Sequence, residues 1–159
     1  FLSFTQRESC GTCTGCRIGT RRMLEILERL CGGQGRPEDL ATLERLAESV
    51  RAGSLCGLGR TAPNPVLSTL RHFRAEAEAH VRGVCPARTC RALIAYTVSD
   101  RCIGCTLCAQ NCAAGAIAFT PLERAVILRE LCTKCDMCRQ ICPEKAIEIE
   151  DAKRDNETR

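Results

Sequence analysis

The chain carries one cysteine pattern twice, as C-I-G-C-T-L-C-A-Q-N-C-A at residues 102–113 and C-T-K-C-D-M-C-R-Q-I-C-P at residues 132–143. Both copies have the spacing C-x-x-C-x-x-C-x-x-x-C, and every cysteine recurs after 30 residues. Three thiolates at this spacing can wrap one face of an iron–sulfur cube in a single tight loop. The repeat therefore predicts two [4Fe–4S] clusters and a role in carrying electrons.

The fourth cysteine of each run is expected to cross to the other cluster, as in two-cluster ferredoxins. One cluster is then assigned to Cys102, Cys105, Cys108 and Cys142, and the other to Cys132, Cys135, Cys138 and Cys112. The apolar runs 116–119, 126–128 and 146–149 are predicted strands. Ala113 stands where the second copy has Pro143, a turn residue that donates no ligand, so both clusters are expected to persist. Two zinc sites are the rival interpretation, disfavoured because zinc rarely uses four such closely spaced cysteines twice.

A third group of cysteines lies near the start of the chain, at Cys10, Cys13 and Cys16, without a fourth nearby. Cys31 and Cys56 compete for that role. Apolar residues from 23 to 30 predict a helix after Cys16, on which Cys31 lies 15 residues further along, roughly 22 Å away. A second helix, opened by Pro37, is expected to return the chain and bring Cys56 back as the fourth ligand of a [4Fe–4S] cluster. Cys31 is then expected to be a buried thiol.

A third helix is predicted from Asn64, as N-cap, through Val66, Leu70, Phe73, Ala77 and Val81 on one face. The expected fold is α+β: a small helical bundle carrying one [4Fe–4S] cluster, followed by a bacterial-type ferredoxin domain with two. The expected boundaries are 1–81 for the bundle, 82–93 for a linker, 94–150 for the ferredoxin domain, and 151–159 for a charged, disordered tail. His72 lies beside the third helix's apolar stripe and is interpreted as structural.

Cys85 and Cys90 are left over, and His80 precedes them by five and ten residues. These three side chains form a candidate zinc site with an unidentified fourth ligand. A pair of thiols without a metal is the equally weighted alternative.

The net charge of +4 does not indicate nucleic-acid binding, because each oxidised all-cysteine cluster adds about −2. Tryptophan is absent and tyrosine occurs once, so stacking residues are scarce. Arg17, Arg21 and Arg22 either form a solvated basic face or compensate the first cluster's charge. The odd count of 15 cysteines and the need for reduced thiols favour the cytoplasm over a secreted, disulfide-bonded protein. No apolar run approaches the roughly 18 residues of a membrane span.

Three segments of the first half are characteristic of one protein family. They are E-S-C-G-T-C-T-G-C-R-I-G-T (8–20), L-C-G-L-G-R-T-A-P-N-P-V (55–66) and R-H-F-R (71–74). The first half resembles the C-terminal cluster domain of the NADH-binding flavoprotein subunit of complex I. With the fused ferredoxin pair, the chain is similar to the beta subunit of electron-bifurcating [FeFe]-hydrogenases and related NAD-dependent formate dehydrogenases. A Cys-Pro-Ala segment like 85–87 is part of that resemblance.

The resemblance implies an electron relay in an NAD(P)-linked complex, in which the first cluster accepts electrons from FMN that exchanges hydride with NAD(H). No glycine-rich flavin or nucleotide loop occurs in these residues, so FMN and NAD(H) are expected elsewhere and no catalytic residue is assigned. Partners implied are other subunits of the complex, with a soluble ferredoxin as a further candidate. A free-standing ferredoxin-like carrier, or a cluster-stabilised docking module, is the alternative function. Whether the terminal partner is a hydrogenase, a formate dehydrogenase or a quinone-reducing arm stays open.

Overall fold

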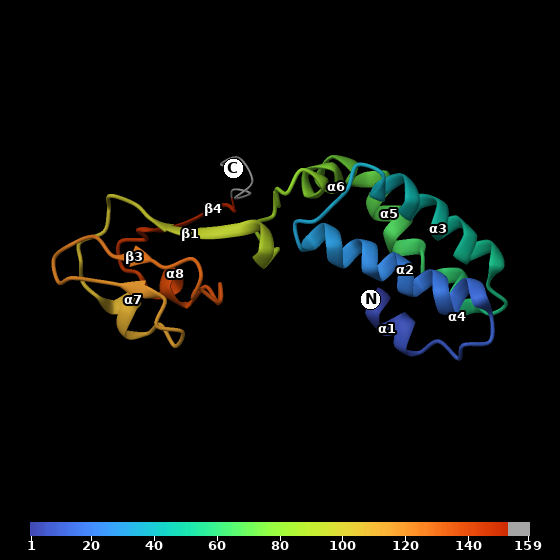
Figure 1. Cartoon of the computed structure of the whole chain (residues 1–159), viewed down its shortest axis with the longest axis horizontal. Helices are drawn as coiled ribbons and strands as arrows, with labels where there is room; N and C mark the ends of the chain where they lie inside the picture. Colours follow the sequence, from blue (N-terminus) through green and yellow to red (C-terminus); the bar gives the residue numbers. More distant parts are fainter. Residues whose placement is uncertain (153–159) are drawn as a thin grey trace. The chain divides into compact units, whose positions relative to one another are not determined.

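The structure is a computed structural model that describes residues 1–152 of the chain. The chain divides into two compact units, Phe1–Pro86 and Ala87 to the C-terminal end, and each is described by itself. The first is helical and the second contains the strands (Figure 1). This arrangement agrees with the predicted α+β class.

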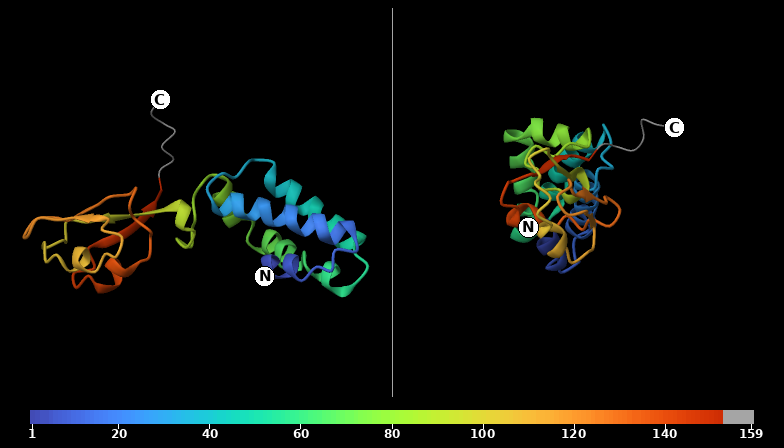
Figure 2. Two further views of the ribbon diagram at one scale, coloured as in Figure 1. Left: turned by 60° about the horizontal axis from the view of Figure 1, so that its bottom comes forward. Right: turned by 90° about the vertical axis from the view of Figure 1, so that its left-hand side faces the viewer.

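The first unit is a bundle of helices. They are α1 (Leu2–Arg7), α2 (Thr14–Cys31), α3 (Asp39–Gly53), α4 (Gly57–Thr61), α5 (Asn64–His72) and α6 (Arg74–Val81). The two long helices, α2 and α3, lie side by side in Figure 1 and in the left-hand view of Figure 2. Their facing apolar stripes form the core with Leu2, Val66 and Leu70, and Met23 and Leu43 are almost fully buried there. The predicted helical hairpin is therefore confirmed.

Three expectations for this unit are wrong. The third helix is broken at Phe73, whose backbone leaves the helical region and whose side chain is exposed. The break redirects the chain so that α6 buries Ala79, and Arg74 reaches Glu44 of α3 with an N···O distance of 2.6 Å. Asn64 is also the first residue of α5 rather than its N-cap, which is Pro63.

The third wrong expectation concerns Cys31, which is exposed rather than buried. It is the last residue of α2. The apolar positions that α2 turns toward α3 end at Leu30, so the core does not extend to the next side chain.

The second unit is built around two short antiparallel sheets. Strand β1 (Ile94–Val98) pairs with β4 (Ile147–Asp151), and β2 (Ile117–Ala118) pairs with β3 (Val126–Ile127). A 3-10 turn (Arg91–Leu93) precedes β1, α7 (Leu107–Gln110) lies in the first cysteine run, and α8 (Met137–Ile141) lies in the second. The three predicted strands are present in shortened or shifted form. β1 was not predicted, because its buried, nearly continuous apolar run carries no alternating pattern.

The first residues of the expected tail belong to the fold. Asp151 ends β4, and the amide of Ala152 donates to the carbonyl of Leu93 at 2.8 Å. The remainder of the predicted tail, 153–159, lies outside the described residues.

Candidate metal centres

The first three cysteines lie where the N-terminal loop leads into α2. Cys13 is the N-cap residue of α2, and Cys16 is buried in its first turn. The hydroxyl of Ser9 lies 3.4 Å from the sulfur of Cys16. The sulfur of Cys10 lies 3.4 Å from the hydroxyl oxygen of Thr12, and the hydrogen bond between these two groups lowers the pKa of Cys10. The open helix N-terminus adds a partial positive charge, which favours thiolates and an anionic group here.

The return helix brings the segment containing Cys56 to the same end of α2. A β-carbon placed on Gly15, near the start of α2, would lie 3.1 Å from the carbonyl of Gly53 at the end of α3. Cys56 then precedes α4, where a β-carbon on Gly59 would lie 3.1 Å from that of Cys16. Cys31, in contrast, is at the opposite end of α2. These close approaches bring the segment that contains Cys56 to the cysteine loop, and its assignment as the fourth ligand stays a prediction.

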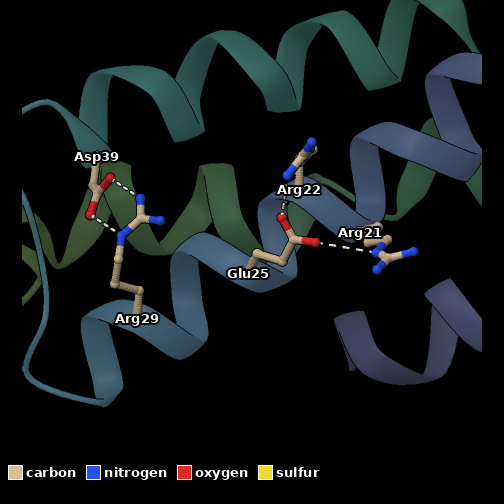
Figure 3. Close-up of polar contacts among 5 residues, drawn as sticks. All are labelled: Arg21, Arg22, Glu25, Arg29 and Asp39. Atoms are coloured by element: carbon tan, nitrogen blue, oxygen red, sulfur yellow. Dashed lines mark hydrogen bonds and ion pairs between the residues drawn. The ribbon is translucent and has the colours of Figure 1, made fainter.

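The three arginines near this loop play different roles. Arg17 donates to the carbonyl of Gly11 at 3.0 Å and so braces the cysteine loop. Arg21 and Arg22 instead pair with Glu25 at 3.2 and 2.8 Å on the exposed side of α2 (Figure 3). For these two the solvated face is the better interpretation.

In the second unit, one cavity is lined by the first three cysteines of the first motif, Cys102, Cys105 and Cys108, together with Cys142 of the second. Burial, followed by the nearby Cys102 and Cys105, raises the pKa of the Cys108 thiol. Grouped thiolates repel one another, so without a metal these side chains favour the protonated form. A bound cation reverses this preference, because it holds the sulfurs deprotonated.

A second cavity repeats the arrangement with the motifs exchanged. It is lined by Cys132, Cys135 and Cys138 together with Cys112 from the first motif. Burial, with the neighbouring Cys132 and Cys135, raises the pKa of Cys138 to about 11. Each cavity thus gathers four sulfur donors with the crossed composition expected from sequence, a donor set that suits a [4Fe–4S] cluster.

The turn after each crossing cysteine has the same geometry in both motifs. The amide of Ala116 donates to the sulfur of Cys112, and that of Ala146 to the sulfur of Cys142, both at 3.3 Å. Ala113 therefore supports the same turn as Pro143. Amide hydrogen bonds to sulfur are among the contacts that set the potential of a bound cluster.

A polar network beside the second motif was missed by sequence reasoning. The buried Tyr96 of β1 donates to Asp136 at 2.7 Å, and Arg139 donates to both oxygens of that carboxylate at 2.6 Å. The Arg139 hydrogen bonds are the largest cause that lowers the pKa of Asp136, to about 2. Burial, then the bond to Asp136, raises the pKa of Tyr96 to about 12. Asp136 lies between Cys135 and Cys138, and its backbone is in the left-handed region, so the network fixes the ligand loop.

His80, Cys85 and Cys90, the residues of the candidate zinc site, form a group of side chains that suits a metal ion. Their ligand atoms all lie within 4.8 Å of one another, and Cys85 is buried. The Nδ1 atom of His80 is 2.7 Å from the carbonyl oxygen of Glu76. Because a carbonyl only accepts, Nδ1 carries the proton, so Nε2 is the nitrogen that would bind a metal, as in many histidine ligands.

Residues 1–80 match the family model described as the NADH-ubiquinone oxidoreductase-F iron-sulfur binding region. The chain belongs to this family. Residues 95–149 also match the 4Fe-4S dicluster domain. This family member is thus an iron–sulfur electron-transfer segment of the kind found in NAD(P)-linked oxidoreductases, and the predicted fold class and family resemblance are confirmed.

Curated relatives of this family member are subunits of redox enzymes. The NADP-reducing hydrogenase subunit HndC of Solidesulfovibrio fructosivorans is 48% identical over 122 residues, which are 76% of this chain and 25% of that protein. An NADH-quinone oxidoreductase subunit of Mycobacterium tuberculosis is 46% identical over 83 residues, 52% of this chain and 19% of that protein. The NADP(+)-dependent formate dehydrogenase subunit beta of Moorella thermoacetica is 48% identical over 73 residues, 46% of this chain and 10% of that protein. The chain spans a quarter or less of the length of these three relatives.

Among the described residues, no helix is both long and apolar enough to cross a membrane.

Proposed function

We propose that this chain relays electrons through three [4Fe–4S] clusters in an NAD(P)-linked, flavin-containing oxidoreductase complex. The crossed composition of the two ferredoxin cavities, each with three cysteines of one motif and one of the other, is the observation that carries the proposal. A [4Fe–4S] cluster held there accepts and returns single electrons. The chain's residues hold the cluster and, through the apolar walls of each cavity, limit the access of water.

The proposed ligands of the first cluster are Cys10, Cys13, Cys16 and Cys56. The contact of Gly59 with Cys16 supports this assignment, because it keeps the N-terminus of α4 beside that of α2. Ser9 and Thr12 supply hydroxyls to two of the sulfurs. The ligands of the other two clusters are the crossed sets already described.

The site of hydride exchange, with FMN and NAD(H), is proposed to lie outside residues 1–159. The names of the hydrogenase and formate dehydrogenase relatives support a complex of one of those two types. Electron bifurcation and exchange with a soluble ferredoxin belong to the same proposal. Purification of the native complex tests it: FMN and a hydrogenase or formate dehydrogenase subunit should be recovered with the chain.

Iron and labile-sulfide analysis tests the cluster content. Three clusters correspond to about twelve irons per chain. Cys56→Ser should lower this to about eight and remove one paramagnetic resonance signal of the reduced protein. The matched variant Cys31→Ser should keep all twelve. Loss of a cluster from Cys31→Ser would overturn the assignment of Cys56.

We also propose that His80, Cys85 and Cys90 hold a structural zinc ion. Their proximity and the Nδ1 contact of His80 support it. The fourth ligand is unassigned. Metal analysis of iron-replete protein should find about one zinc per chain, and Cys90→Ser should lower it without loss of iron. Zinc-free protein with full iron content would exclude this site.

A free-standing electron carrier is the alternative function, favoured by the ferredoxin-like second unit alone. The helical unit argues against it, since a simple soluble carrier does not need a cluster on a helical hairpin. Recovery of the chain without flavin or partner subunits, but with full iron content, would favour the alternative.

A further inference from the structure

Apolar side chains surround the ligand loop of the first ferredoxin motif and remain exposed. Ile103, Leu107 and Phe119 line the same cavity as Cys102, Cys105 and Cys108. All three are at least 41% exposed. Leu122 lies against this loop, since its amide donates to the carbonyl of Gly104 at 3.2 Å. We call these four apolar residues, Ile103, Leu107, Phe119 and Leu122, the Leu122 surface.

Leu122 is unusual in both conformation and exposure. Its φ of +68° lies in the left-handed region, which leucine rarely adopts. Its side chain is 89% exposed, so packing within the described structure does little to offset that cost. Strained, exposed residues of this kind concentrate at functional sites.

The internal repeat provides a comparison for the loop itself. Residues 103–107 read I-G-C-T-L, whereas the equivalent residues 133–137 read T-K-C-D-M. Both loops bring three cysteines to one cavity, so holding a cluster does not require an apolar exterior. The uncharged, apolar exterior of the first loop therefore has another cause.

Two carboxylates stand at the edge of this surface. Glu123 and Glu144 line the same cavity and are exposed. Within residues 1–152 neither forms an ion pair, whereas the nearby Arg124 pairs with Asp100 at 2.6 Å. An apolar centre with a charged rim is the usual composition of a protein interface. The negative rim selects a partner with basic residues around its own apolar patch.

We propose that the Leu122 surface, with Glu123 and Glu144 at its rim, docks an electron-transfer protein whose contact face is apolar and edged by lysine or arginine. The inference rests on the proposed function, because it makes this surface the point at which the relay exchanges electrons with another protein. In each encounter one electron passes from the reduced chain to the oxidised partner, and no bond forms or breaks. The apolar centre sets how long the complex lasts, and the carboxylates speed its formation.

Oxidised cytochrome c, a haem protein with a basic surface, is a suitable probe for the full, iron-loaded chain. Stopped-flow absorbance measures its reduction by the dithionite-reduced chain after the reductant is removed. Leu122→Asn and Phe119→Ser should each lower the second-order rate constant about tenfold. Asn tolerates the left-handed conformation, so Leu122→Asn is expected to fold. Glu123→Gln with Glu144→Gln should flatten the dependence of the rate on ionic strength.

A matched control is Leu131→Ser, because Leu131 is 54% exposed, close to the 51% of Phe119, and lines neither ferredoxin cavity. It should leave the rate unchanged. Calorimetric titration of the two oxidised proteins gives a second readout: binding to the parent chain should show a negative heat-capacity change, as apolar burial requires, and Leu122→Asn should reduce it.

The inference is overturned if Leu131→Ser slows cytochrome c reduction as much as Phe119→Ser does. It is also overturned if Leu122→Asn, in a chain with full iron content, does not slow the reduction. Both results leave the proposed function intact. A dimer of the iron-loaded chain that Leu122→Asn converts to monomer also overturns it, because a second copy would then occupy the surface. A chain that assembles no iron–sulfur clusters overturns the proposed function itself.

Discussion

The carboxylate of Asp39 is buried at the first position of α3. Figure 3 shows it facing Arg29 of α2, which forms two hydrogen bonds with it, and the Arg36 amide donates a third at 2.9 Å. Burial by itself would raise the pKa of Asp39, but the contacts with Arg29 and Arg36 outweigh it, so the pKa is lowered. The pair joins the end of α2 to the start of α3.

Asp39→Asn should lower the free energy of unfolding of the helical unit by about 2 kcal/mol, because it leaves Arg29 without its charged partner. Since the folded pKa lies below the usual value of about 3.9, the stabilisation is complete above that pH. It is lost as the pH falls through the folded pKa. Urea denaturation followed by circular dichroism should therefore show a constant difference from pH 8 to 5 that shrinks below about pH 4.

The neighbouring Glu38→Gln is the control, since Glu38 is exposed. It should change stability by less than about 0.5 kcal/mol. A difference between Asp39→Asn and the parent chain that grows on acidification would contradict the ion-pair account.

Tyr96 offers a second prediction at a single side chain. Tyr96→Phe removes the 2.7 Å hydrogen bond to Asp136 and should destabilise the second ligand loop by about 1 kcal/mol. The cluster proposed in that cavity should then be lost to a chelator about fivefold faster, measured by bleaching of its visible absorbance. Thr97→Ala, one residue along the same strand, should show the parent rate. If Tyr96→Phe loses the cluster at the parent rate, the Tyr96–Asp136 network does not contribute to cluster retention.

Among the elements, α4 has the clearest positional role. It is only five residues long, it begins directly after Cys56, and its Gly59 lies against Cys16 in the first turn of α2. Gly59 permits this contact, because an added β-carbon would meet the side chains of Ser54 and Cys16. A larger residue must push α4 away from α2.

Gly59→Ala should therefore lower the iron content from about twelve to about eight per chain, since only the first cluster depends on this contact. Gly57→Ala, in the same helix, should retain all of it, because no atom lies within 4 Å of the added β-carbon. Iron analysis with paramagnetic resonance of the reduced protein checks both variants. Equal iron contents in the two would show that α4 does not position Cys56.

The elements also show how far sequence reasoning reached. Helices α2 and α3 were predicted from their 3.6-residue apolar period, and that period is visible because one face of each is buried. The helix break at Phe73 was not predicted, because Phe73 continues the apolar stripe and no proline or glycine marks the position. Strand β1 was missed for the opposite reason, as a run buried on both faces shows no alternation.

At the scale of the whole molecule, the chain consists of two compact units, with the boundary between Pro86 and Ala87. Each has its own core, centred on Met23 and Leu43 in the first and on Ile94, Tyr96 and Ile147 in the second. A separate core is the physical requirement for independent folding.

The peptides 1–86 and 87–159 should therefore each take up iron when reconstituted separately, about four in the first and about eight in the second. Iron analysis and the paramagnetic resonance signals of the reduced peptides measure this. The intact chain reconstituted in parallel is the control. Failure of either peptide to take up its iron would contradict independent folding of the two units.

The sequence by itself determined the ferredoxin spacing, the helical hairpin and the family, because ligand spacing and helix period are local properties of the chain. It also singled out His80, Cys85 and Cys90. Only the tertiary structure decided which side chains meet from distant positions: Asp39 with Arg29, Tyr96 with Asp136, and Leu122 with the loop of Gly104. These contacts depend on the directions in which helices and loops return. No local pattern records such directions, since they follow from how the whole core packs.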